Sequence, residues 1–267
     1  YFSYKYPYRV ISVMKINHLL AKWPPGSIAT QAWLHEHGVG PSLIQKYQHT
    51  GWVERVGHGA WKRSGDDLDW HGGVVALQQD ATVQIWPGGA TALSLAGYSH
   101  YLAFGTQAVD LFGTSEALLP GWFRKHEWKA QVNFYRGALF AELEDMALQL
   151  FQVPYRQFAL KISTPERAVL ELIHQSDDEM LFSGVADVLS GLATLSPKRL
   201  QKLLEACNSI RVKRVFLLLA RNANHAWYRR IDRSSIDMGK GKRQIIRGGR
   251  LDKEFLITVP ERFANAT

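Results

Sequence analysis

The sequence has little cysteine and no long apolar run, and both absences narrow the class of protein. Cys207 is the only cysteine among 267 residues, so an intramolecular disulfide and a cysteine-based zinc site are excluded. The longest apolar run, at 215–220, lies between two arginines and is far shorter than the roughly 18 residues that span a bilayer. Residues 1–13 contain no apolar core followed by a cleavage site. We therefore expect a cytoplasmic protein with no membrane partner.

Motifs of the common catalytic classes are also missing. The glycine- and lysine-rich stretch at 239–243 lacks the Gly-x4-Gly-Lys-Ser/Thr spacing of a P-loop, and no glycine follows Ser99 where a nucleophile elbow needs one. His35 and His37 are two residues apart on a predicted helix, so they point away from each other, unlike the i, i+4 pair of a zinc protease. We predict no catalytic residue, no metal site and no cofactor, and hence a protein that is not an enzyme.

Charge is distributed unevenly along the chain. The net charge is +8, from 32 Lys and Arg against 24 Asp and Glu. Residues 1–64 carry 8 basic against 2 acidic side chains and residues 198–253 carry 16 against 4, whereas residues 65–197 carry 7 against 16. Basic blocks attract polyanions through phosphate neutralisation and counterion release, so nucleic acid is the leading partner class. A solvated basic surface without a partner stays open as the alternative for either block.

The N-terminal pattern predicts three short helices. Apolar residues recur at spacings of three and four over 16–23, and Pro24-Pro25-Gly26 ends that helix. Ser27 is expected as the N-cap of a second helix over 28–37. A third helix is predicted over 41–49, because it begins with a proline, whose missing N–H costs nothing at the first helical position.

A hairpin is predicted after the third helix. Residues 52–56 alternate as a strand does, Gly57-His58-Gly59 makes a tight turn, and residues 60–63 form the returning strand. Three short helices and a hairpin with a basic tip are typical of a winged helix-turn-helix, in which the third helix enters the major groove and the hairpin, or wing, contacts the backbone or minor groove. Residues 1–64, which we call the head, are therefore predicted to be a DNA-binding domain. Met14 is followed by a helical pattern and resembles a natural translation start. Two readings of residues 1–13 therefore stay open, a native segment and a non-native extension.

The residues expected to contact DNA are polar or basic. Amides, hydroxyls and cations on a short helical face are what base-edge and phosphate contacts require, although most amphipathic helices of this kind are ordinary surface helices. The expected contacts are Ser42, Gln45, Lys46 and His49 in the third helix, Arg55, His58, Lys62 and Arg63 in the wing, and Thr30 and Gln31 in the second helix. Core packing is expected for Trp33 and Trp52 rather than base stacking.

The larger part of the chain, residues 65–267, mixes predicted strands and helices. Regular alternation is missing, so the fold class is predicted to be α+β, with a winged head followed by a larger mixed domain. Thr164 and Pro165 are typical of the start of a helix. The other expected helices cover 68–79, 90–96, 182–192, 197–206 and 212–220, and the expected strands cover 83–86, 108–112, 132–135, 158–162, 244–246 and 255–259.

Five strings, in order, resemble the AbiEi family, which comprises the antitoxins and transcriptional regulators of type IV toxin–antitoxin, or abortive infection, systems. The strings are GWVERVGHG at 51–59, TAL at 91–93 with GYSHYL at 97–102, STPERA at 163–168, VKRVF at 212–216, and GKGKR at 239–243 with GG at 248–249. The resemblance extends from Lys15 to Pro260, which is nearly the whole chain.

This resemblance implies two functions. The head would repress its own promoter by binding double-stranded DNA at inverted repeats, and residues 65–267 would counteract a nucleotidyltransferase-like toxin. Because neutralisation in type IV systems need not involve a stable protein complex, direct contact with the toxin stays open. The candidates for antitoxin function are Arg214, Lys240, Lys242 and Arg243. The second basic block could instead contact DNA flanking the operator or an RNA substrate of the toxin.

Two other classes of function remain as alternatives. One is an effector-responsive winged-helix repressor with a C-terminal domain that binds a small molecule, for which the aromatic-rich stretch at 86–112 would line the pocket. The other is a nucleic-acid-modifying enzyme that uses the basic body, which the missing catalytic motifs disfavour.

Overall fold

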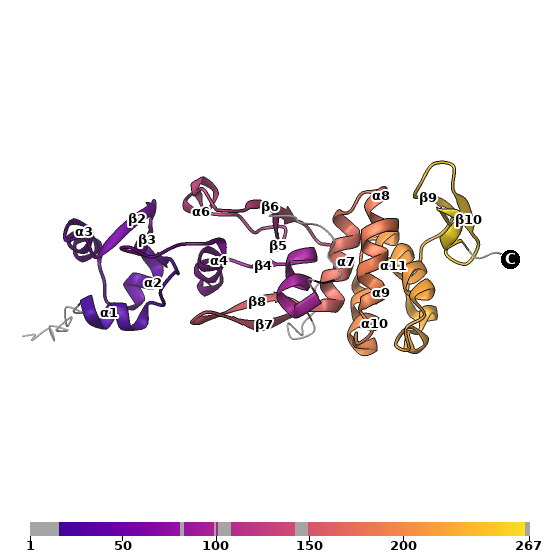
Figure 1. The fold of residues 1–267 in the computed structure, drawn as a ribbon, viewed down its shortest axis with the longest axis horizontal. Helices are drawn as coiled ribbons and strands as arrows, with labels where there is room; N and C mark the ends of the chain where they lie inside the picture. The colour runs from indigo at the N-terminus through magenta and orange to yellow at the C-terminus, as the bar shows by residue number, and fades with distance from the viewer. Residues whose placement is uncertain (1–15, 81–82, 99, 101–107, 142–148, 265–267) are drawn as a thin grey trace, which may run out of the picture. The chain divides into compact units, whose positions relative to one another are not determined.

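The computed structural model describes residues 16–80, 83–98, 100, 108–141 and 149–264 (Figure 1). The chain divides into two compact units, and it leaves the first unit and returns to it twice. The first unit comprises Tyr1–Gln84, Leu118–Lys129 and Pro154–Leu160, and the second comprises Ile85–Ala117, Ala130–Val153 and Lys161–Thr267. The predicted head lies in the first unit, and the extension at 1–13 lies outside the described residues.

The head contains the three helices and the hairpin predicted from the sequence. Its elements are α1 (Ile16–Lys22), β1 (Ala29–Thr30), α2 (Gln31–Glu36), α3 (Pro41–His49), β2 (Val53–Gly57) and β3 (Ala60–Arg63). The strands form an antiparallel sheet in the order β1-β3-β2, so the short strand β1, which was not predicted, completes the sheet beside the hairpin. Figure 1 shows α1, α2 and α3 arranged around this sheet.

The second helix begins three residues later than predicted, and Ser27 is not its cap. The N-cap of α2 is Thr30, whose Oγ1 accepts a hydrogen bond of 3.3 Å from the backbone N–H of Trp33. Ser27 is buried, and its hydroxyl donates to the carbonyl oxygen of Pro24 at 2.7 Å. Ala29 and Thr30 are extended because they pair with β3. This pairing outweighs the local preference for a helix start at a serine that follows a proline turn.

Apolar side chains from every element of the head form one core. Trp23 at the end of α1 packs against Trp33 of α2, with ring centroids 5.9 Å apart. The buried members are Leu19, Trp23, Ala29, Leu34, Val39, Ile44, Tyr47, Val53 and Trp61. Burial of Ile44 and Tyr47 fixes which face of α3 points inward and leaves the opposite face to solvent.

Two further helices belong to the first unit. They are α4 (Trp70–Gln79), which was predicted, and α6 (Gly121–Lys125), which was not. Asp69 caps α4 by accepting hydrogen bonds from the backbone N–H groups of His71 and Gly72. Its other carboxylate oxygen accepts a hydrogen bond of 2.8 Å from the Tyr155 hydroxyl and lies 3.3 Å from the guanidinium of Arg156. One carboxylate thus joins the start of α4 to the returning segment 154–160.

The second unit combines three small sheets with a helical layer. The sheet order is β4-β5-β6, with β5 antiparallel to β4 and parallel to β6, followed by the β7–β8 pair and the sheet β10-β11-β9. The strands are β4 (Ile85–Pro87), β5 (Ala108–Gly113), β6 (Gln131–Arg136), β7 (Leu150–Tyr155), β8 (Phe158–Ser163), β9 (Arg243–Gln244), β10 (Arg250–Asp252) and β11 (Ile257–Val259). Strands β7 and β8 extend into segment 154–160 of the first unit.

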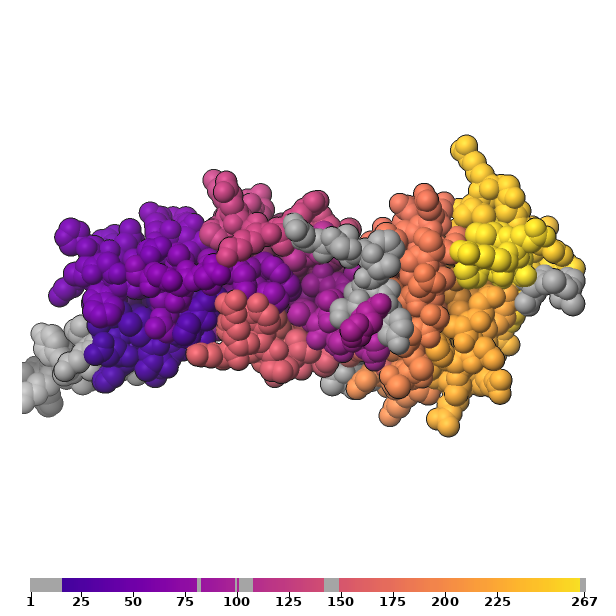
Figure 2. Space-filling view, in the orientation of Figure 1, coloured from indigo at the N-terminus to yellow at the C-terminus, as the bar shows by residue number. Residues whose placement is uncertain are grey.

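The longest helices of the second unit each bury at least one apolar face. The longest, α11 (Ile210–Ala223), buries every side chain from Val212 to Ala220. The others are α5 (Gly89–Leu93), η1 (Ser94–Tyr98), α7 (Pro165–Gln175), α8 (Asp178–Met180), η4 (Leu181–Val185), α9 (Ala186–Gly191), α10 (Pro197–Ala206), η5 (Tyr228–Arg230), η6 (Arg233–Ser235) and η7 (Glu261–Phe263). Figure 2 shows the C-terminal segment, in yellow, beside the orange helices of the same unit.

A buried polar network explains the STPERA string at 163–168. Thr164 caps α7, as predicted, by accepting from the backbone N–H of Arg167. Glu171, which is 1% exposed, accepts hydrogen bonds from Trp86 Nε1, Gly89 N, Ser163 Oγ and Arg167 Nε. Because each partner is buried as well, this string holds β4, β8 and α7 together and is structural.

The predicted α+β class is confirmed by this mixture of helices and strands. A separate N-terminal domain precedes the larger mixed one, as expected. Within the described ranges, no helix is both long enough and apolar enough to cross a membrane.

Candidate nucleic-acid interface

The exposed face of α3 carries four of the residues predicted to contact DNA. Ser42, Gln45, Lys46 and His49 are exposed and follow the spacing of three and four residues that places side chains on one face of a helix. In the part of the chain that the structure describes, Gln45 and Lys46 make no side-chain hydrogen bond or ion pair. An amide and a cation on this face are therefore available to a partner.

A groove separates α3 from the wing. It encloses about 180 Å³ and is lined by residues of α2, α3 and the hairpin, among them Gln31, Gln45, Arg55 and His58. The indole Nε1 of Trp61 donates a hydrogen bond of 3.2 Å to Gln48 Oε1 and thereby ties the wing to α3. Both edges of the groove carry predicted DNA contacts, so the structure brings the helix and wing candidates to one surface.

The four basic candidates in the wing differ in whether their side chains are already bound within the protein. Arg55 and His58 are exposed, and among the described residues the side chain of Arg55 makes only a local hydrogen bond to the carbonyl oxygen of Gly57. Lys62 forms an ion pair of 3.1 Å with Glu54 and donates to the carbonyl oxygen of Asp66. Arg63 donates to the carbonyl oxygen of Trp23 at 3.1 Å. Lys62 and Arg63 therefore stabilise the head, whereas Arg55 and His58 extend into solvent.

Glu54 is the centre of the contacts at the base of the wing. Hydrogen bonds from the Ser64 hydroxyl, the Gly65 N–H and the Lys62 ammonium, together with the charge of Lys62, lower the pKa of Glu54. The carboxylate therefore stays ionised at neutral pH and offsets the charge of Lys62. This pairing reduces the positive charge that the wing can offer to phosphate.

The second helix contributes one accessible candidate. Thr30 uses its hydroxyl oxygen to cap α2, whereas Gln31 is exposed. The backbone N–H of Gln31 donates to the carbonyl oxygen of Gly59 at 2.9 Å, so this residue lies at the turn of the wing. Gly59 adopts φ +72°, a left-handed conformation that glycine accommodates without strain.

Trp52 does not pack in the core as predicted. Its side chain is 47% exposed at the start of the wing, whereas Trp33 is half-buried and packs on Trp23 and His37. The alternation of the strand explains the difference, because Val53 takes the inward position and leaves its neighbour outward. Trp52 is thus an exposed aromatic on the same unit as the candidate face.

A basic segment that sequence reasoning missed lies against the wing. Helix α6 packs Trp122 directly on the backbone of Gly57. A Cβ atom added to Gly57 would lie only 2.7 Å from the Cβ atom of Trp122. Arg124 and Lys125 of α6 are exposed, and in the described residues neither forms an ion pair. The pattern Trp122-Phe123-Arg124-Lys125 gave a signal, two buried aromatics followed by two cations, but its distance along the chain from the wing concealed the contact.

The candidates for antitoxin function lie together near the C-terminus of the second unit, but Arg214 is buried. It is 1% exposed and lies on α11. Its guanidinium donates hydrogen bonds to the carbonyl oxygens of Met238, Gly239, Gly241 and Leu256. Arg214 therefore cannot reach a partner directly and instead fixes the shape of the loop that follows η6.

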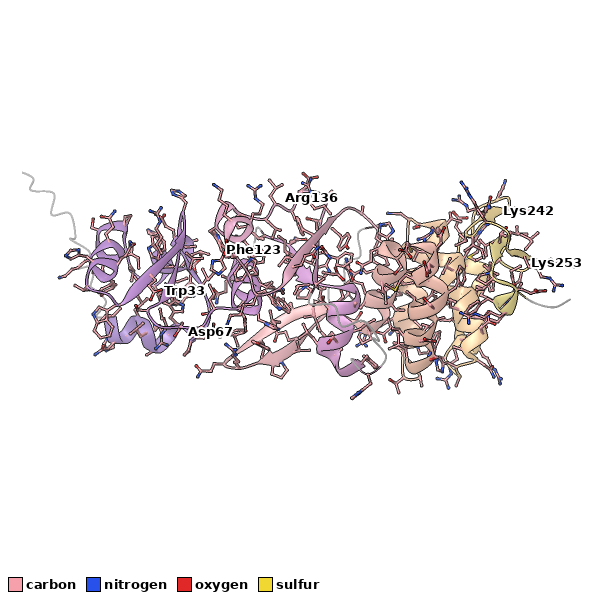
Figure 3. The ribbon with its side chains drawn as sticks, turned by 45° about the horizontal axis from the view of Figure 1, so that its top comes forward. Trp33, Asp67, Phe123, Arg136, Lys242 and Lys253 are labelled. Atoms are coloured by element: carbon pink, nitrogen blue, oxygen red, sulfur yellow. The ribbon has the colours of Figure 1, made fainter. Side chains whose placement is uncertain are left out.

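That loop presents Lys240, Lys242 and Arg243 to solvent. Gly239 and Gly241 adopt φ values of +63° and +77°, so their carbonyl groups turn toward Arg214. A side chain at either position would be strained in this conformation. The GKGKR string is thus a loop in which glycines bind the buried arginine while the intervening cations point outward, and Lys242 lies on this segment in Figure 3.

The aromatic stretch at 86–112 does not form one pocket wall. Trp86 is buried in the network around Glu171, and residues 99 and 101–107 lie outside the described residues. Phe112 alone of the described aromatics in this stretch lines a cavity of the second unit.

Family models match both parts of the chain. Residues 106–260 match the model described as "Transcriptional regulator, AbiEi antitoxin, Type IV TA system", and residues 12–104 match that described as "Transcriptional regulator, AbiEi antitoxin N-terminal domain". No curated protein matches the chain significantly.

One solved structure is similar over most of its length. It is described as "Crystal structure of RV2827C protein from Mycobacterium tuberculosis", and it aligns with a TM-score of 0.59 at 16% sequence identity, covering 91% of this chain and 89% of that one. At this identity the likeness concerns the fold.

Proposed function

Because the chain belongs to the AbiEi family of transcriptional-regulator antitoxins of type IV toxin–antitoxin systems, we propose that it represses its own promoter and counteracts the toxin encoded beside it. DNA binding is assigned to a winged helix-turn-helix within residues 1–64. The observation that carries this assignment is the exposed face of α3, where Gln45 and Lys46 have no partner among the described residues.

The dimensions of α3 suit a major groove. An α-helix with its side chains is about 10 to 12 Å in diameter and the major groove is about 12 Å wide, so the groove admits one helix, and the nine residues of α3 make about two and a half turns. Gln45 is the candidate for base reading, because an amide can pair with adenine in two hydrogen bonds. Lys46 is assigned to phosphate, since a cation there would act on every sequence alike.

The wing and α2 are assigned to the DNA backbone. Arg55 and His58 are the side chains of the wing that are free to approach phosphate or the minor groove, and Gln31 lies beside its turn. Ser42 and His49 extend the face of α3 at its two ends. Thr30, Lys62 and Arg63 act indirectly in this proposal, by holding α2 and the wing in place.

The operator is proposed to contain inverted repeats. Two copies of the head would then occupy half-sites separated by about one helical turn, or 34–36 Å. We place the protein in the cytoplasm because its DNA is there.

Antitoxin function is assigned to the second unit, with a nucleotidyltransferase-like protein as the toxin. The exposed cations of the GKGKR loop, Lys240, Lys242 and Arg243, are the side chains proposed to act, and Arg214 positions them. A non-enzymatic mechanism accords with a family of regulators. The charge of this loop favours an action on a polyanion, such as the RNA substrate of the toxin, over a stable protein complex.

Two assays separate the two halves of this proposal. In a promoter–reporter strain, the wild-type chain and a Lys240→Gln/Lys242→Gln variant should repress equally, whereas Gln45→Ala/Lys46→Gln should not repress. When each chain is expressed from a foreign promoter together with the toxin, the pattern should reverse. Gln45→Ala/Lys46→Gln should rescue growth, whereas Lys240→Gln/Lys242→Gln should not. Failure of the wild-type chain to rescue growth would refute the antitoxin half alone.

A second candidate function, that of an effector-responsive repressor, is favoured by one observation. The second unit contains a cavity of about 720 Å³, which lies within the usual range of small-molecule sites.

A further inference from the structure

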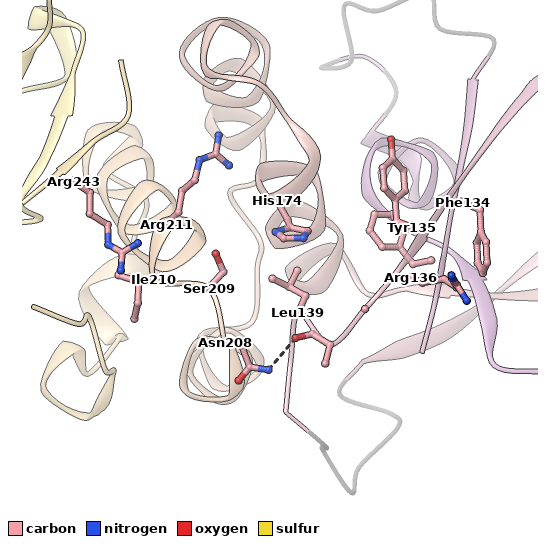
Figure 4. A pocket seen from close by; sticks show the side chains of 13 residues that line it. Phe134, Tyr135, Arg136, Leu139, His174, Asn208, Ser209, Ile210, Arg211 and Arg243 are labelled. Carbon is pink, nitrogen blue, oxygen red and sulfur yellow. Dashed lines mark hydrogen bonds between the residues drawn. The ribbon is translucent and has the colours of Figure 1, made fainter. Parts of the chain in front are cut away.

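The cavity of about 720 Å³ in the second unit is built from segments far apart in the sequence. Its walls come from the end of β6 and the residues after it, from α7, from the start of α11 and from β9. Figure 4 shows Arg211, Ser209 and Arg243 on one side of this cavity and Tyr135 on the other, with His174 and Leu139 between them. The hydrogen bond from Asn208 Nδ2 to the carbonyl oxygen of Ala138, 2.9 Å long, joins the two sides.

The lining is strongly cationic. Arg136, Arg211 and Arg243 line the cavity, and the described residues of its lining include no carboxylate. Arg211 is held in place by hydrogen bonds to the carbonyl oxygens of Ile173 and Ser176 and by an ion pair of 3.2 Å with Asp178. A guanidinium fixed in this way is preorganised, so little conformational entropy is lost when it binds an anion.

Arg243 carries an uncompensated charge. It is exposed, and its side chain has no hydrogen bond or ion pair within the described ranges. Its backbone is nevertheless fixed, because its N–H donates to the carbonyl oxygen of Leu256 at 2.9 Å and Arg214 binds the carbonyl of Gly241 two residues earlier. A free cation on a held backbone at the edge of a cavity is suited to binding an anion.

The start of α11 adds to the positive potential. The 14-residue helix begins at the cavity with Ser209 as its N-cap, and its first turn carries Arg211 and Lys213 but no acidic residue. Acidic residues or anions normally stabilise this end of a helix, and cations do not. Asp178 compensates Arg211 in part, but the excess charge at this end remains positive.

The opposite side of the cavity offers a flat aromatic surface. Tyr135 stacks on Phe112 with ring centroids 5.0 Å apart, and burial raises the pKa of its hydroxyl, with a further contribution from the charge of Asp110. Burial and the charge of Arg211 lower the pKa of His174, which is therefore neutral at pH 7 and can donate one hydrogen bond and accept another. Glu171 acts on His174 in the opposite sense, more weakly.

We propose that this cavity binds a nucleotide, with its phosphates at Arg211 and Arg243 and its base against Tyr135. Guanidinium groups suit phosphate oxygens, and an aromatic face accepts any base by stacking. The same chemistry is offered by a free nucleotide and by the terminal nucleotide of an RNA. The site is independent of DNA binding by α3, because every residue that forms it belongs to the second unit.

Binding to the full-length chain tests this proposal by calorimetry with ATP, GTP, CTP, UTP, adenosine and pyrophosphate. Nucleoside triphosphates should bind, adenosine should bind at least about tenfold more weakly, and pyrophosphate should compete. Arg243→Gln should weaken binding at least about tenfold. Arg247→Gln, which removes an exposed arginine of the same segment that does not line the cavity, should leave it unchanged.

A second arm identifies the source of the ligand. A short single-stranded RNA is titrated into the wild type, Arg243→Gln and Lys46→Gln. Binding that Arg243→Gln weakens and Lys46→Gln does not, in the absence of binding by free nucleotides, supports the site and assigns it to an RNA end. The proposal is overturned if neither free nucleotides nor RNA bind the folded wild-type chain at millimolar concentration, or if Arg243→Gln and Arg247→Gln behave alike.

Discussion

The guanidinium Nη1 of Arg214 lies 2.8 Å from the carbonyl oxygen of Gly241 and donates a hydrogen bond to it. Three further carbonyls bind the same side chain, so one buried cation determines the conformation of the loop that carries Lys240 and Lys242. Burial and the charge of Arg243 both lower the pKa of Arg214.

Replacing Arg214 by glutamine should destabilise the second unit. The shorter amide cannot satisfy four carbonyls, so we expect a loss of about 2 to 4 kcal/mol in the free energy of unfolding. Urea denaturation of the full chain measures it, with Arg247→Gln as the matched surface control that should change stability by less than about 0.5 kcal/mol. Equal stability of the two variants would mean that Arg214 does not hold this loop.

Replacing the two central side chains on the exposed face of α3, Gln45 and Lys46, should impair DNA binding in different ways. Gln45→Ala is expected to lower affinity for the operator by about 1 to 3 kcal/mol and to leave affinity for unrelated DNA unchanged. Lys46→Gln should weaken both duplexes and reduce the salt slope by about one. Fluorescence anisotropy over a range of salt concentrations measures both effects. If neither variant changes DNA affinity, α3 is not the recognition helix.

Neutralising α6 should reduce the dependence of DNA binding on salt. Arg124 and Lys125 are exposed on a helix that packs against Gly57 of the wing, so we expect each to bind one phosphate. The double variant Arg124→Gln/Lys125→Gln should reduce the slope of log affinity against log salt by about two. Lys129→Gln, which removes a cation already paired with Asp67, is the control. An unchanged slope in the double variant would exclude α6 from the interface.

Removing Glu54 should strengthen non-specific DNA binding. In Glu54→Gln the ammonium of Lys62 loses its ion pair and becomes available to phosphate. We expect the salt slope to become steeper by about one, and the further change Lys62→Gln should cancel that gain. Binding to a random duplex at several salt concentrations provides the measurement. A gain that persists in the double variant would show that Lys62 is not the residue released.

The carboxylate of Asp69 should make stability fall in acid. Burial alone would raise the pKa of Asp69, but hydrogen bonds from His71, Tyr155 and the Gly72 N–H, together with the charge of His71, hold it well below its ordinary value. The unfolded chain therefore binds a proton near pH 4 that the folded chain does not, so this stabilisation is present above pH 4 and is lost as the pH falls below it.

Asp69→Asn tests this linkage. Between pH 5 and pH 2 the variant should lose stability less steeply than the wild type, whereas Asp187→Asn, at an exposed carboxylate of α9, should keep the wild-type slope. Urea midpoints at each pH supply the comparison. Parallel curves for all three proteins would contradict the assignment.

Local signals determined much of the head. Helix α3 begins at Pro41 and ends at His49 as predicted, because the proline fixes its start and the apolar spacing fixes its buried face. Strand β1 was not foreseen, since its two residues carry no period and exist only through pairing with β3.

The partner of Lys62 was concealed by a bulge. In the hairpin, Gly57 of β2 pairs with Ala60 of β3. If this register continued without interruption, Arg55 would lie opposite Lys62. An irregularity between Arg55 and Gly57 shifts the strands by one residue and places Glu54 opposite Lys62 instead. A single extra residue thus decides which charge of the wing stays free.

The contacts that sequence reasoning missed are long-range. Helix α6 has five residues, too few to show a helical period, and it joins the head only because segment 118–129 returns to the first unit. Arg214 was identified as a functional candidate, but its four carbonyl partners lie 24 to 42 residues away in the chain. Packing of this kind leaves no local pattern.

The affinity of the full-length chain for a duplex from its own promoter, measured by fluorescence anisotropy against a shuffled duplex of equal composition, tests sequence-specific DNA binding most directly. The promoter duplex should bind at least about a thousandfold more tightly, and Gln45→Ala should remove part of that preference. Equal affinity for the two duplexes would contradict the proposed repressor function.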